Sequence, residues 1–77
     1  MKLELAFNSD QGTNKYIVNW DFQFIPRTGD LLWGMAYFFR ENNIPEGIWG
    51  DYQITVETVY FCHDETEMYI SLDLLCE

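Results

Sequence analysis

The residue types best suited to chemistry lie near the end of the chain, where Cys62, His63 and Asp64 are consecutive. A thiol beside an imidazole is a pairing used in nucleophilic catalysis, and a carboxylate can orient the imidazole. Consecutive residues of a strand point to opposite faces, which makes direct cooperation between Cys62 and His63 unfavourable. The neighbouring acids, Asp64 and Glu65, are typical of a solvated hairpin turn, and the chain has no glycine-rich phosphate loop. We therefore predict that the protein is not an enzyme.

The two cysteines, Cys62 and Cys76, leave two alternatives open. Each falls near the end of a predicted strand, so a cross-strand disulfide is compatible with their positions. Small secreted domains usually carry more cysteines than two, which favours free thiols. Cys62, His63, Asp64 and Cys76 together are metal-binding residue types without a recognised ligand spacing. We predict no cofactor and no metal.

Composition limits the size of the domain and the classes of partner. The 77 residues carry 13 acidic and 4 basic side chains, a net charge of −9. A chain of this length forms one domain, residues 1–77. Its acidity disfavours direct binding to nucleic acid or to an anionic membrane. Because neither a signal peptide nor an apolar run of about 20 residues is apparent, we expect a cytoplasmic protein.

Residues 15–24 have the clearest periodicity in the chain. Polar side chains alternate there with large apolar ones, and Ile17 is the one exception. A period of two over ten residues predicts a half-buried strand. The side chains predicted to point into the core are Tyr16, Val18, Trp20, Phe22 and Phe24.

The next residues predict a tight turn. Pro26 fixes its own φ near −65°, and Gly29 can adopt the positive φ that closes a type I turn. Asp30 is placed to accept backbone N–H groups or to face Arg27. Turn geometry accounts for all four residues, and a binding role for Arg27 is the alternative.

Three further strands are predicted by alternation, at residues 2–7, 52–61 and 68–74. Residues 31–39 are ambiguous: Gly34 and the aromatic content favour a strand, whereas Asp30 could begin a helix over 31–41. Residues 41–51 then form a long loop. We predict an all-β protein, a small five-stranded SH3-like antiparallel barrel, with one short helix as the alternative for residues 31–41.

The run Ile25-Pro26-Arg27-Thr28-Gly29-Asp30 between two strands resembles a turn in small uncharacterised bacterial and phage proteins of the SH3-like barrel type. A later strand containing Val56-Glu57-Thr58-Val59 and an alternating last strand extend the resemblance over residues 16–75. The stretch from Gly34 to Asp51 is longer than the connection expected at this place in such proteins. The resemblance implies a fold and no catalytic residues.

Aromatic residues make up 18% of the chain, more than the inward strand positions need. We predict that Trp33, Phe38 and Trp49 form an exposed interaction surface, since exposed aromatic patches mark protein contacts. The expected function is a small interaction or assembly module that binds a protein partner or a second copy of itself. The alternative is an acidic inhibitor that mimics nucleic acid through outward carboxylates, for which the candidates are Glu4, Asp21, Glu57 and Asp73.

Overall fold

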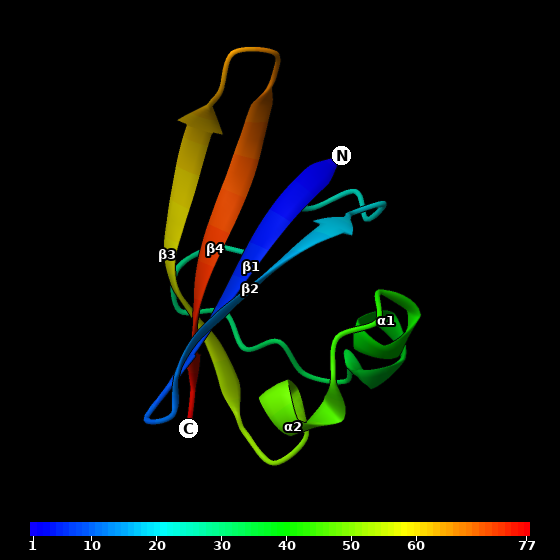
Figure 1. Cartoon of the computed structure of the whole chain (residues 1–77), viewed down its shortest axis with the longest axis vertical. Helices are drawn as coiled ribbons and strands as arrows, with labels where there is room; N and C mark the ends of the chain where they lie inside the picture. Colours follow the sequence, from blue (N-terminus) through cyan, green and yellow to red (C-terminus); the bar gives the residue numbers. More distant parts are fainter.

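Two β-hairpins form a single sheet in the computed structural model, which describes residues 1–77. Strands β1 (Lys2–Ser9) and β2 (Gly12–Asn19) form one hairpin, and β3 (Ile54–His63) and β4 (Met68–Cys76) form the other. A parallel pairing of β1 with β4 joins them in the order β2-β1-β4-β3 (Figure 1). The prediction of a mainly β protein is confirmed. The prediction of a five-stranded antiparallel barrel is wrong, because the sheet has four strands and its central pair is parallel.

Residues 20–53, which connect the two hairpins, contain the two helices. The predicted strand over 31–39 is wrong: helix α1 occupies Ala36–Glu41, and only Leu31 makes an isolated bridge, to Thr55. The helical alternative for residues 31–41 is therefore the correct one for 36–41. A second short helix, α2, spans Glu46–Trp49, and both helices lie on the same side of the sheet (Figure 1).

A Schellman motif ends α1. Asn43 has a left-handed φ of 59°, its N–H donates to Arg40 O, and the N–H of Ile44 donates to Phe39 O. The motif is normally accompanied by an apolar contact between its first and last residues, and both Phe39 and Ile44 belong to the core. This helix end thus brings two core side chains over the sheet.

Strand β2 is shorter than the predicted strand over 15–24. The ladder ends where the Trp20 N–H donates to Met1 O at 2.7 Å, and residues 22–24 then form a bend outside the strand. Val18 and Trp20 are buried as predicted, and Tyr16 is half-buried. The prediction is wrong for Phe22 and Phe24, whose side chains are 43% and 61% exposed.

A turn forms in the predicted segment, but one residue later than predicted: the Asp30 N–H donates to Arg27 O at 2.9 Å, so Pro26 precedes the turn and Gly29 is one of its two central residues. Gly29 has a φ of 95°, and the backbone N–H of Arg27 donates to the Asp30 carboxylate at 2.8 Å. The turn then contacts the edge of β3, where the Gly29 N–H donates to Val56 O and the Val56 N–H donates to Asp30 O, both at 2.8 Å. Residues 29–32 thus cover the first part of that edge, in place of a full fifth strand.

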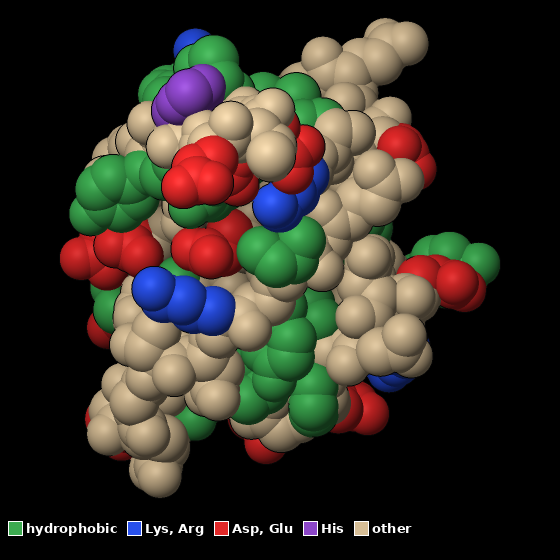
Figure 2. Space-filling view, turned by 45° about the horizontal axis from the view of Figure 1, so that its top comes forward, with side chains coloured by type: hydrophobic (Ala, Val, Ile, Leu, Met, Phe, Trp, Pro, Cys, Tyr) green, Lys and Arg blue, Asp and Glu red, His purple; other side chains and the backbone are tan.

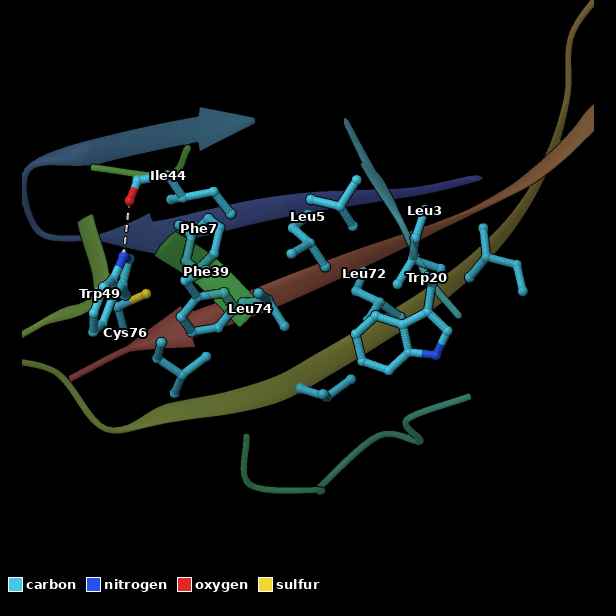
Figure 3. Packing of buried hydrophobic residues seen from close by; sticks show 14 residues of the cluster. Leu3, Leu5, Phe7, Trp20, Phe39, Ile44, Trp49, Leu72, Leu74 and Cys76 are labelled. Carbon is cyan, nitrogen blue, oxygen red and sulfur yellow. Dashed lines mark hydrogen bonds between the residues drawn. The ribbon is translucent and has the colours of Figure 1, made fainter. Parts of the chain in front are cut away.

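The core lies between one face of the sheet and the connecting residues 20–53. Trp20 and Trp49 lie at its two ends, with Phe7, Phe39 and Leu74 between them (Figure 3). The Trp49 Nε1–H donates to Ile44 O at 3.1 Å, so its one polar atom is satisfied in the core. The opposite face of the sheet, here called the outer face, has no layer of chain over it.

Candidate functional site

The fold does not bring together the residues considered for catalysis or metal binding, which are Cys62, His63 and Cys76. Cys62 pairs across the hairpin with Tyr69 and His63 pairs with Met68, so the thiol and the imidazole project from opposite faces of β3. Cys76 pairs with Ile54, at the other end of the same ladder. Both cysteines are free, and Cys62 and Cys76 are too far apart along the ladder to bridge within one chain.

The reactivity of these groups is set by their surroundings. Burial raises the pKa of the Cys76 thiol, partly offset by a hydrogen bond from the Asn8 backbone. The pKa of Tyr69 is raised, mainly by the neighbouring Cys62. A raised thiol pKa reduces the fraction of thiolate, which is the nucleophilic form. Neither residue therefore resembles an activated nucleophile.

Asp64 has a structural task in the turn between β3 and β4. Its Oδ1 accepts the backbone N–H groups of Thr66 and Glu67, both at 2.9 Å, and the Thr66 hydroxyl at 3.1 Å. These bonds, led by the one from the Thr66 backbone, lower the pKa of Asp64. Lys2 forms an ion pair with Glu67 at 3.0 Å beside this turn.

The lowered pKa predicts how this turn responds to acid. A folded-state pKa below the unfolded value means that the carboxylate stabilises the fold above the unfolded pKa, and that this contribution disappears as pH falls through the folded pKa. We expect a carboxyl NMR titration of Asp64 to give a midpoint below the ordinary aspartate value of about 3.9. Thr66→Val removes only the hydroxyl bond and should raise the midpoint slightly, and a wild-type midpoint at or above that ordinary value would contradict the assignment.

The three aromatic residues predicted to form an interaction surface differ in how exposed they are. Trp33 is 86% exposed, the largest exposed fraction among the large apolar side chains. Phe38 is half-buried, with its ring 5.3 Å from Trp20 and 5.4 Å from Phe22. Trp49 is only 8% exposed and belongs to the core, so the expectation that it is exposed is wrong.

Three residues that were not predicted to belong to an interaction surface form one with Trp33. Phe24 and Leu31, the latter 54% exposed, line with Trp33 a surface groove of about 210 Å³. Phe22 extends it, since its ring centroid lies 5.9 Å from that of Phe24. We call Phe22, Phe24, Leu31 and Trp33 the aromatic surface. Asp30 lines the same groove and gives it a negative charge.

A second apolar groove lies at the hairpin end of the sheet. It has a volume of about 230 Å³ and is lined by Met1, Phe61, Met68, Tyr69 and Ile70. Phe61, which is 74% exposed, also borders a groove that contains Pro26 and Arg27. The predicted turn therefore lies between the two apolar regions, because Pro26 also lines the groove of the aromatic surface.

The four acids considered for nucleic-acid mimicry do not form one group. Glu4 accepts the Ser71 hydroxyl at 2.9 Å on the outer face, and Asp73 lies diagonally across from it. Glu57 lies at the β-bulge of β3, and Asp21 comes after β2 and accepts the Asn19 amide. Figure 2 shows acidic, basic and apolar side chains interspersed on the face that carries the β3–β4 hairpin.

No helix in the structure combines the length and the apolar character needed to cross a membrane. Comparison with protein-family models, curated proteins and solved structures finds no significant match. The geometry of the aromatic surface is therefore the basis on which a function can be inferred.

Proposed function

We propose that this chain is a small non-catalytic interaction module that binds a protein partner through the aromatic surface. The observation that carries the proposal is the exposure of Trp33, 86%, beside Phe24, 61%, in one groove. Tryptophan and other aromatic residues are enriched in the centres of protein interfaces. In water, by contrast, a tryptophan with this exposure contributes almost nothing to folding, so burial in a complex would give it a role.

The size of the aromatic surface favours a transient complex. Taking the usual area of about 150–250 Å² for a large apolar side chain, the exposed parts of its four members amount to on the order of 400–600 Å². A patch of that size is at the upper end for a monomeric protein and is often functional. Standard interfaces bury about 800 Å² per partner, and weaker ones bury less. The surface therefore fits reversible binding better than an obligate dimer.

Charge indicates which partner would fit. The chain has a net charge of −9, and Asp30 lies in the groove itself. A second copy would bring the same negative charge to this surface, whereas a segment with an apolar centre and flanking Lys or Arg would be attracted to it. We therefore assign the aromatic surface to a basic partner with an apolar or aromatic anchor.

Selection from a random peptide library displayed on phage tests this proposal. Wild-type protein should enrich peptides that combine an aromatic or leucine anchor with Lys or Arg, and their affinity should fall as salt is raised. Trp33→Ala should weaken a selected synthetic peptide by about tenfold or more, as expected for the loss of a central aromatic contact. Fluorescence anisotropy of the labelled peptide measures both effects.

The matched control is Tyr60→Ala, which removes an aromatic side chain that is 47% exposed on the outer face. It should bind the selected peptide as well as the wild type does. Equal affinities for Trp33→Ala and the wild type would contradict the proposal, as would a set of enriched peptides without basic residues.

The acidic mimic remains a second candidate because of the net charge of −9. On the outer face, however, Glu4 and Asp73 share the surface with Lys2 and Lys15. A phosphate mimic needs carboxylates of one sign along one face, whereas this face carries both signs. Peptide binding that is abolished by moderate salt and unaffected by Trp33→Ala would favour the mimic over the aromatic surface.

A further inference from the structure

Strand β2 is an edge of the sheet with uncovered backbone groups along its length. The N–H of Trp20 donates to Met1 O at 2.7 Å, and the Met1 amino group donates to Trp20 O at 3.2 Å. Hydrogen-bonded pairs alternate along an antiparallel ladder, so the even-numbered residues of β2 bond to β1. The N–H and C=O groups of the odd-numbered residues point away from the sheet. They belong to Thr13, Lys15, Ile17 and Asn19.

The opposite edge is protected in ways that β2 lacks. On β3, residues 29–32 already bond to Ile54 and Val56, and a bulge between Val56 and Thr58 interrupts the ladder beyond them. Covering segments and bulges are common means of preventing edge-to-edge pairing. Strand β2 has neither of them, and six of its eight residues are exposed. Strand β2 therefore offers an added strand a longer uninterrupted edge than β3, where only Thr58–His63 lie beyond the bulge.

Charge indicates that the strand added at β2 would come from a second copy of the chain. The sequence of β2, GTNKYIVN, has one lysine and no acidic residue in a protein with a net charge of −9. Two copies would meet there with the least mutual repulsion available to them. We propose that β2 pairs antiparallel with β2 of a second copy, forming a two-fold symmetric dimer with one continuous sheet. This contact is separate from the aromatic surface and does not depend on the function proposed for it.

The alternation of side chains selects the register. With Tyr16 on the two-fold axis, Lys15 pairs with Ile17 of the second copy and Thr13 pairs with Asn19, so every outward backbone group of β2 has a partner. Ile17 is 56% exposed, and the aliphatic stem of the facing lysine would cover it. A register centred on Lys15 would place two ammonium groups opposite each other, which is unfavourable. A register centred on Ile17 would leave Thr13 unpaired.

Hydrogen exchange of individual amides, measured by NMR at tens and at several hundred micromolar, tests the proposal. The amides of Lys15 and Ile17 should exchange rapidly in the dilute sample and become protected in the concentrated one. The amides of Tyr16 and Val18, which bond to β1, should be protected in both samples. Sedimentation of the same samples should show a monomer–dimer equilibrium.

Two substitutions at one position separate the contact from the fold. Ile17→Pro removes an outward N–H that β1 does not use, and proline is accepted on a free edge. It should raise the dissociation constant by about 100-fold, because two-fold symmetry doubles each lost hydrogen bond. Ile17→Lys leaves the backbone intact, places a second ammonium group directly opposite Lys15 of the other copy and should also give a monomer. Tyr60→Ala, on β3, should dimerise like the wild type.

Three results would overturn the proposal. They are a monomer at several hundred micromolar, a dimer in which Lys15 and Ile17 amides gain no protection, and a dimer that survives both substitutions at Ile17. A dimer lost with Trp33→Ala and retained with Ile17→Lys would place self-association on the aromatic surface and would likewise reject the β2 contact.

Discussion

Replacing Trp20 with alanine should lower the free energy of unfolding by about 3–5 kcal/mol. The side chain is 2% exposed, and its Nε1–H donates to Phe24 O at 2.7 Å. Its ring packs edge-on against those of Phe22, Phe24 and Phe38, with centroids 4.8, 6.0 and 5.3 Å away. The substitution would leave a large cavity and an unpaired carbonyl. A domain of this size has a total stability of about 4–12 kcal/mol, so the variant should be close to unfolded.

Urea denaturation monitored by circular dichroism measures this effect, and Trp33→Ala is its matched control. Trp33 is 86% exposed, so the same substitution there should change the free energy of unfolding by no more than about 0.5 kcal/mol. The pair separates a tryptophan that holds the fold from one that is free to bind a partner. Equal denaturation midpoints for the two variants would contradict the claim that the buried Trp20 side chain stabilises the fold.

The two hairpins could be predicted from the sequence because both signals are local. In β1 and β4 the apolar residues recur with period two, and they are Leu3, Leu5, Phe7, Leu72 and Leu74, all buried. Alternation shows which face of a strand is apolar, but it does not show which strand lies beside it. The parallel pairing of β1 with β4 was therefore not predictable from periodicity, and a barrel of antiparallel strands was the wrong choice.

The end of β2 shows a second limit of periodicity. Alternation continues to Phe24, although β2 ends at Asn19 and the last bond of its ladder is the one from the Trp20 N–H to Met1 O. The point at which strand pairing ends is tertiary information. As a result, Phe22 and Phe24 lie on the surface, and the aromatic surface contains two residues that the pattern assigned to the core. Counting aromatic residues predicted a surplus, but not which residues would supply it.

Helix α1 carried a signal that the sequence reasoning missed. Asn42-Asn43-Ile44-Pro45 is a helix-stop sequence: asparagine accepts the left-handed conformation, isoleucine closes the apolar contact and proline cannot continue the helix. Reading Asn43 as the terminating residue would have placed a helix before it and assigned Phe39 to the core. The relation to small SH3-like proteins, suggested by the Ile25–Asp30 turn, stays a prediction.

Replacing Gly29 with valine should lower the free energy of unfolding by about 1–3 kcal/mol, measured as a lower urea midpoint. Gly29 has a φ of 95°, a region that β-branched residues rarely adopt. A Cβ added there would meet no atom within 4 Å, so the cost would come from backbone strain and not from a clash. Relief of that strain would move the Gly29 N–H away from Val56 O and loosen residues 29–32 from the edge of β3.

Gly47→Ala is the control that separates the cost of a positive φ from the effect of adding a side chain to glycine. Gly47 lies in α2, its φ is not positive, and an added Cβ would again meet no atom within 4 Å. Alanine reduces the freedom of the unfolded chain, so this variant should be more stable than the wild type by about 0.4–1 kcal/mol. Opposite signs for the two substitutions are expected because only Gly29 needs a conformation reserved for glycine. A Gly29→Val variant with the wild-type midpoint would mean that the turn which places residues 29–32 on β3 is wrongly assigned.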